Sequence, residues 1–89
     1  MISYLLISLA GEKPAMVAQE LLKLESVENV HVVYGDCDLI VHAFTENLID
    51  LRESVLTNVV NLKGVKRVST LIVAEWNGCI LKEIKLIGL

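Results

Sequence analysis

Leu24-Glu-Ser-Val-Glu-Asn-Val30 is followed 38 positions later by Leu62-Lys-Gly-Val-Lys-Arg-Val68, and this internal repeat decides the fold. The repeat extends upstream, so that five apolar positions of the first copy match five of the second. The matched residues are Val17, Leu21, Leu24, Val27 and Val30 in the first copy, and Val55, Val59, Leu62, Val65 and Val68 in the second. In each copy the first three positions have the spacing of one helix face, and the last two begin a β-rich run.

Another apolar run lies upstream of each predicted helix, at Ile2–Leu9 and at Leu39–Phe44. The chain therefore contains two strand–helix–strand units in succession. This order predicts an α+β, ferredoxin-like βαββαβ fold, with two helices on one face of an antiparallel four-stranded sheet. Because that architecture hosts many unrelated functions, the fold by itself assigns none.

Residues that favour turns and helix ends separate these runs. Pro14 suits the first turn of a helix that runs to about Leu24, and Asn47 suits the N-cap of a helix that runs to about Leu62. The predicted strands are 2–9, 29–35, 39–45 and 65–75. Residues 1–75 are therefore expected to form the ferredoxin-like domain. Residues 76–89 form a C-terminal extension, which we expect to be an extra edge strand or arm.

The composition excludes several classes of protein. A formal charge of −3 argues against a nucleic-acid surface, and no apolar run approaches the ~20 residues of a membrane span. The first residues lack the basic segment of a signal peptide, so a cytoplasmic location is expected. Cys37 and Cys79 match no metal-binding spacing and are expected to be two unrelated thiols. We expect neither a metal nor a cofactor.

The predicted strands carry apolar residues on both faces. Leu39 and Val41 alternate with Ile40, and Leu71 alternates with Ile72. Two helices cover only one face of a four-stranded sheet, and an antiparallel sheet with one solvated face should alternate apolar and polar residues. A second copy of the sheet, or the C-terminal arm, is therefore expected to cover the other face, and a homodimer is the simplest answer.

Two longer motifs resemble a known family. The hairpin region reads Val30-His-Val-Val-Tyr-Gly-Asp-Cys-Asp-Leu-Ile-Val41, and the last strand reads Gly64-Val-Lys-Arg-Val-Ser-Thr-Leu-Ile-Val73. At this spacing they resemble the ligand-binding domain, also called RAM, of the Lrp/AsnC family of leucine- and asparagine-responsive regulators. The resemblance covers about residues 2–75.

The resemblance implies a ferredoxin-like domain that dimerises through its sheets and assembles further into octamers or related rings. It also implies that a free amino acid binds between dimers as the effector, near the Gly-x-x-Asp hairpin. The positions that match the family's site are Gly35, Asp36, Cys37 and Asp38 of the hairpin, together with Ser69 and Thr70 of the last strand.

The chemistry of such a site agrees with these residue types. Backbone N–H groups around a glycine-containing turn can hold a carboxylate. The carboxylate of Asp36 or Asp38 can hold an ammonium group by charge-assisted hydrogen bonds, and the Thr70 hydroxyl can add orientation. An alternative remains open, in which Gly-x-x-Asp is only a hairpin turn capped by its own aspartate.

The chain also departs from the family pattern. In the family a DNA-binding helix-turn-helix normally precedes this domain, and none is expected here. The chain therefore resembles the family's stand-alone members, which would not bind DNA and would join full-length regulators. Family members usually carry an aromatic residue where Cys37 stands. The segment Trp76–Leu89 extends past the usual end of the domain, and Trp76 is expected to be an interface anchor.

An amino-acid-binding regulator has two alternatives, an enzyme and a structural module. A small enzyme on the same fold would need a positioned electrophile or an activated nucleophile. The chain's arginines are Arg52, in a predicted helix, and Arg67, which begins the last strand with no loop predicted beside it; no Ser/His/Asp grouping has suitable spacing. We therefore predict no enzymatic activity. A purely structural oligomerisation module or adaptor, without a ligand, remains the other alternative.

His31 and His42 lie on either side of the hairpin. If Asp36 and Cys37 are its two loop residues, the register pairs these histidines directly, and such a pair could bind a metal or sense pH. Ordinary surface or interface histidines are the simpler interpretation.

Overall fold

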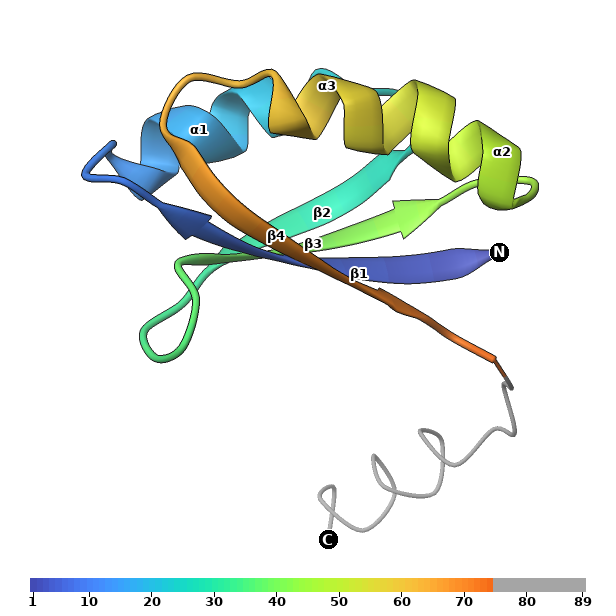
Figure 1. The fold of residues 1–89 in the computed structure, drawn as a ribbon, viewed down its shortest axis with the longest axis horizontal. Helices are drawn as coiled ribbons and strands as arrows, with labels where there is room; N and C mark the ends of the chain where they lie inside the picture. Colours follow the sequence, from blue (N-terminus) through green and yellow to red (C-terminus); the bar gives the residue numbers. More distant parts are fainter. Residues whose placement is uncertain (75–89) are drawn as a thin grey trace, which may run out of the picture.

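The helices lie on one face of a four-stranded antiparallel sheet in the computed structural model, which describes residues 1–74 (Figure 1). The strands are β1 (Ile2–Leu9), β2 (Val27–Val32), β3 (Leu39–Phe44) and β4 (Val65–Ile72), in the spatial order β2-β3-β1-β4. The helices are α1 (Pro14–Leu21), α2 (Leu48–Asp50), η1 (Leu51–Leu56) and α3 (Thr57–Val60). The ferredoxin-like prediction is confirmed. The arm predicted at residues 76–89 lies outside the described residues.

α2, η1 and α3 form one continuous helical stretch, whose middle part has the wider turns of a π-helix. Directly after η1, the hydroxyl of Thr57 donates to the carbonyl of Arg52, five residues earlier, at 2.9 Å. Among residues 1–74 no helix is long and apolar enough to cross a bilayer.

The core lies between the helices and the sheet, and the internal repeat supplies much of it. Val17, Leu21, Val27, Val55 and Val59 are buried, and the other five repeated residues pack against them while partly exposed. Leu5, Ile7, Leu39 and Val41 complete the centre from β1 and β3, with no exposed surface. Each repeat thus supplies one helix face and the start of one strand to the same core.

Side-chain hydrogen bonds define the start of the second helical stretch. The Oδ1 atom of Asn47 accepts from the backbone N–H of Asp50 at 2.8 Å, as predicted for an N-cap. The carboxylate of Asp50 accepts from the Ser54 hydroxyl at 2.7 Å and from the backbone N–H of Glu46 at 3.1 Å. The Ser54 hydrogen bond, followed by that from Glu46, holds the pKa of Asp50 below its usual value of 3.8.

A first prediction follows for Ser54→Ala. A lowered pKa means that ionised Asp50 stabilises the folded state at every pH above 3.8, and that this stabilisation is lost as the pH falls through the lowered pKa. The substitution removes the main cause of the shift, so the pKa of Asp50 is expected to rise towards 3.8. An NMR titration of the carboxyl carbon measures it. An unchanged pKa would show that Ser54 does not act on this carboxylate.

The second face of the sheet carries none of the helices of residues 1–74, and we call it the open face. Cross-strand pairs place on it the alternate residues of β1, β3 and β4. These residues are Ile2, Tyr4, Leu6, Ser8, Ile40, His42, Phe44, Arg67, Ser69 and Leu71. Phe44 and Leu71 are each 53% exposed. Apolar side chains therefore lie on both faces of the sheet, as predicted, and residues 1–74 leave one of these faces uncovered.

The β2–β3 hairpin loop lies one residue earlier than the predicted Gly35–Asp38. The backbone N–H of Val33 donates to the carbonyl of Asp38 at 3.0 Å, which makes Tyr34–Cys37 the loop. His31 therefore pairs with Ile40, and His42 pairs with Asn29. The direct pairing of His31 with His42, which required a two-residue loop, does not form, because the longer loop shifts the register by two residues and leaves them diagonal neighbours on the open face.

Candidate ligand-binding site

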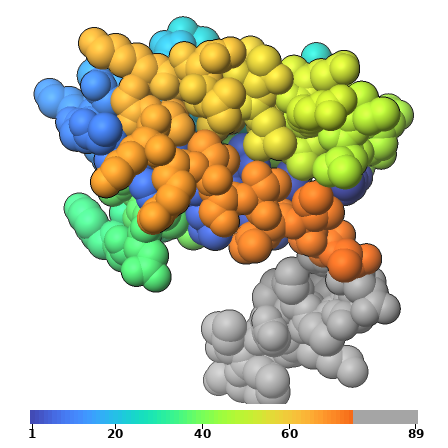
Figure 2. All heavy atoms as spheres, viewed as in Figure 1, coloured from blue at the N-terminus to red at the C-terminus, as the bar shows by residue number. Residues whose placement is uncertain are grey.

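The hairpin loop curls below the sheet, on the side away from the helices (Figure 1), and the space-filling view shows it as a separate projection (Figure 2). Gly35 has φ +144°, a backbone conformation that residues other than glycine rarely adopt. Tyr34 beside it is fully exposed. The loop is thus built to project from the sheet and not to pack on the core.

A pocket of about 430 Å³ lies where this loop meets the open face. Asp36 and Cys37 come from the loop, Leu6 and Ser8 from β1, and Arg67 and Ser69 from β4. The pocket therefore combines one acidic side chain, one basic side chain and two hydroxyls with the apolar surface of Leu6. Residues from three separate parts of the chain meet there because β1 lies between β3 and β4.

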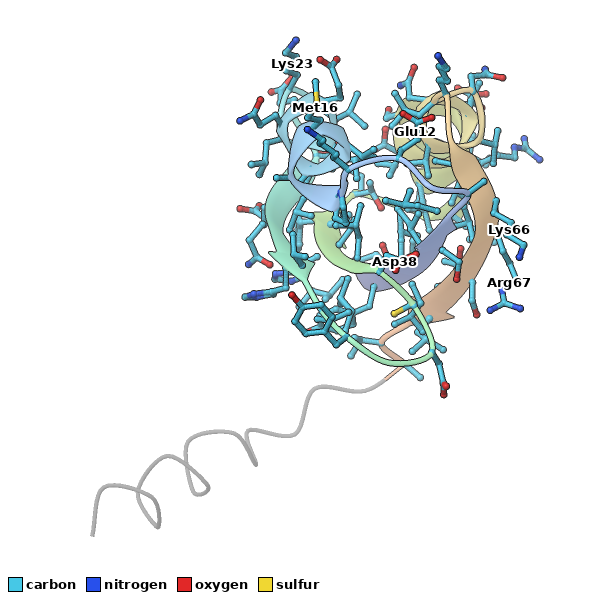
Figure 3. The ribbon with its side chains drawn as sticks, turned by 90° about the vertical axis from the view of Figure 1, so that its left-hand side faces the viewer. Glu12, Met16, Lys23, Asp38, Lys66 and Arg67 are labelled. Atoms are coloured by element: carbon cyan, nitrogen blue, oxygen red, sulfur yellow. The ribbon has the colours of Figure 1, made fainter. Side chains whose placement is uncertain are left out.

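Asp38 has a structural task beside the pocket. Its Oδ2 atom accepts from the backbone N–H of Leu9 at 2.7 Å, where the pairing of β1 with β4 becomes irregular. Its own N–H donates to the carbonyl of Ile7 at 2.9 Å. Asp38 thus attaches the hairpin to the end of β1 (Figure 3). The alternative of a turn capped by its own aspartate does not describe this contact, because the carboxylate caps another strand.

A second prediction separates the two aspartates by stability. Asp38→Ala leaves a partly buried N–H without its acceptor, and such a loss costs about 1–3 kcal/mol in the free energy of unfolding. Asp36→Ala changes an exposed loop side chain and is expected to alter stability by no more than about 0.5 kcal/mol. Urea denaturation of the two variants measures both values. Equal values would contradict the structural role of Asp38.

The six predicted site residues do not all meet. Asp36, Cys37 and Ser69 line the pocket, whereas Gly35 shapes the loop without lining it, and Asp38 is bound to β1. Thr70 pairs with Leu5, whose side chain is completely buried under the helices, so Thr70 points to the opposite face from Ser69. Neighbouring residues of a strand alternate between its faces, so Ser69 and Thr70 could not both enter one pocket on the sheet.

Sequence reasoning missed Leu6, Ser8 and Arg67. The sequence does not assign Arg67 to a site, because it predicts no loop beside the start of the last strand. The structure brings the β2–β3 loop there, two strands away in the sheet. The alternation along β4 was an available signal, because Arg67, Ser69 and Leu71 occupy the same face.

An aromatic and polar cluster lies near the centre of the open face. The rings of Tyr4 and His42 stack with centroids 5.1 Å apart and planes inclined by 18°. The side-chain amide of Asn29 lies 3.4 Å from Nδ1 of His42, close enough to donate a hydrogen bond to it. These contacts occupy His42 within the chain and join three strands across the open face.

Comparison with known proteins gives a family. The family model of the Lrp/AsnC ligand binding domain matches residues 3–76, which is most of the chain. None of the curated sequences compared with the chain matches it.

Solved structures give the same fold. A hypothetical protein from Pyrococcus horikoshii is 29% identical, with a TM-score of 0.76 over 86% of this chain and 94% of that chain. The structure of Escherichia coli AsnC is 17% identical, with a TM-score of 0.73 over 84% of this chain and 51% of that chain. A transcriptional regulator from Neisseria meningitidis, solved as a complex with L-Met, is 18% identical, with a TM-score of 0.71 over 83% and 49%. The last two likenesses establish the fold alone.

Proposed function

Because the chain belongs to the family of Lrp/AsnC ligand-binding domains, we propose that it binds a free amino acid as an effector and forms homo-oligomers. Its role is regulatory, in amino-acid metabolism or transcription. The observation that carries the proposal is the pocket at the hairpin, where Asp36, Cys37 and Ser69 meet at one end of the open face. These are three of the six residues that the family resemblance had marked from sequence alone.

The pocket has the chemistry that an amino acid requires. The carboxylate of Asp36 offers a charge-assisted hydrogen bond to an ammonium group, and the Ser69 hydroxyl can donate or accept beside it. Leu6 provides an apolar surface for a side chain. A volume of about 430 Å³ lies within the range of small-molecule sites. Gly35 shapes the loop and Asp38 attaches it to β1, whereas Thr70 lies on the other face of β4.

The open face supports homodimerisation. The open face carries apolar side chains from β3, β1 and β4, among them Ile40, Leu6 and Leu71, and large exposed apolar surfaces on small proteins mark interaction sites. A second copy of the same face has a matching character, and closed two-fold dimers are the commonest oligomers. The pocket opens at the rim of this face, because Leu6 belongs to both. Assembly of dimers into an octamer or ring is proposed through the projecting hairpins.

The net negative charge supports the proposal that the chain does not itself bind nucleic acid, since binding to phosphates requires clustered basic residues. We therefore propose that it acts in the cytoplasm by joining full-length Lrp/AsnC regulators through the open face. The L-Met complex of the regulator from Neisseria meningitidis supports an amino acid as the class of ligand.

A ligand-free oligomerisation module is the second candidate function, and the uncovered open face favours it. An enzyme is disfavoured, because the family that matches is a ligand-binding domain. Among residues 1–74, those that line the pocket include no histidine that could act as a general base.

Native mass spectrometry tests the proposal, because one spectrum records both the number of subunits and any bound small molecule. The protein is sprayed alone and with each of the twenty standard L-amino acids. We expect even multiples of the subunit mass, and one or a few amino acids that add their mass. An assembly without any added mass would favour the ligand-free module, and a bare monomer in every spectrum would contradict both functions.

A further inference from the structure

Arg67 and Asp36 carry opposite charges, line the same pocket and do not form an ion pair with each other. Among residues 1–74 the ion pair within 4.0 Å joins Lys23 to Glu20. Opposite charges that face one pocket without meeting leave a space in which a ligand can pair with both. A ligand that does so carries a negative group at one end and a positive group close to it.

Arg67 makes one long contact and keeps most of its donors available. Its Nη2 atom donates to the hydroxyl of Ser8, its cross-strand partner, at the long distance of 3.4 Å. The guanidinium has five N–H donors in a planar fork that matches a carboxylate, so this single contact leaves the others available among the described residues. Figure 3 shows the side chain extending away from β4 and the core.

The charges also select the class of ligand. A simple carboxylic acid would pair with Arg67 but leave Asp36 without a partner, and an amine would do the reverse. A dicarboxylate without an amine would bring a second negative charge towards Asp36. A zwitterionic α-amino acid satisfies both groups, and Leu6 and Cys37 remain for its side chain.

We propose that Arg67 binds the α-carboxylate of a free amino acid while Asp36 binds its α-ammonium group. This inference rests on the proposed function and changes one part of the chemistry expected from sequence, in which backbone N–H groups of the glycine turn held the carboxylate. The site therefore requires an unmodified α-carboxylate and an unmodified α-amine. It rejects α-carboxamides, N-acetylated amino acids and peptides whose terminal groups are blocked.

Isothermal titration calorimetry tests the role of Arg67. The probes are the twenty standard L-amino acids and their α-carboxamides, and the proteins are the wild type, Arg67→Gln, Arg67→Lys and Lys66→Gln. Lys66→Gln is the matched control, because it removes the same charge from the adjacent, exposed position, which does not line the pocket. The melting temperature of each variant verifies that it is folded.

We expect the wild type to bind the free amino acid at least about tenfold more tightly than its carboxamide, since a charge-assisted pair contributes about 1.5 kcal/mol or more. Arg67→Gln should lose that preference by weakening only the free acid. Arg67→Lys should keep part of it, and Lys66→Gln all of it. If Arg67→Gln keeps the preference while Asp36→Ala abolishes binding, the amino-acid site stands and Arg67 is not its anchor. If no amino acid binds the wild type, both the proposed function and this inference fail.

Discussion

Replacing Ile40 with glutamate is expected to convert the protein into monomers. Ile40 lies half-buried on the open face, opposite Leu6 of β1 and His31 of β2. A dimer formed by two open faces would bury both copies of the new carboxylate without a partner. A buried unpaired charge costs several kcal/mol, and at about 3 kcal/mol for each of the two copies the dissociation constant rises by about ten-thousandfold. Sedimentation equilibrium measures the change.

Ile49→Glu is the matched control. Ile49 is 61% exposed and lies in α2, on the other side of the molecule from the open face. The substitution introduces the same charge on a surface that the proposed dimer leaves in solvent, so the dimer should persist. The opposite pattern, in which Ile49→Glu gives monomers and Ile40→Glu does not, would place the interface on the helices.

Asp36→Ala is expected to weaken binding of the amino acid by about tenfold to a hundredfold, since a hydrogen bond to a charged group contributes about 1.5–3 kcal/mol. The dimer should remain intact, because Asp36 lies in the exposed hairpin loop and outside the apolar part of the open face. Calorimetry with the amino acid that binds the wild type gives the affinity, and sedimentation gives the assembly.

Glu28→Ala provides the control for Asp36. It removes one negative charge from an exposed position in β2 that does not line the pocket. Wild-type affinity is expected for this variant. Binding that survives both Asp36→Ala and Asp38→Ala would show that the amino acid binds elsewhere.

Local sequence predicted the fold because the elements repeat. The spacing of Val17, Leu21 and Leu24 marks a helix face wherever it occurs, and the second copy at residues 55–62 repeats the pattern. Proline at position 14 and asparagine at position 47 mark helix starts by chemistry that depends on a few neighbouring residues. Strand and helix bounds differ from the prediction by only a few residues for the same reason.

The hairpin register could not be read in this way. Gly35-Asp36-Cys37-Asp38 suits a two-residue loop as well as a longer one. The structure forms the longer loop, in which Asp38 bonds on both sides, through its carbonyl to Val33 and through its N–H to Ile7. The second of these contacts is with a strand about thirty residues away. The register is therefore set by tertiary pairing with β1 and not by the turn residues.

Only part of the pocket could be predicted from the sequence, for a related reason. Asp36, Cys37 and Ser69 carried a motif that is visible in sequence. Arg67 reaches the pocket only because of the strand order, which places β4 beside β1 and within reach of the hairpin loop. The difference between Ser69 and Thr70 likewise depends on which face of β4 meets the helices.

The melting temperature of the wild-type protein with each of the twenty standard L-amino acids at millimolar concentration tests the central claim most directly. A ligand present at a hundred times its dissociation constant stabilises the folded state by about 2.7 kcal/mol. For a domain of this size each kcal/mol raises the melting temperature by about 4–8 °C. We predict such a rise with one or a few amino acids and none with the others. Identical melting temperatures across the whole panel would contradict an amino-acid effector site.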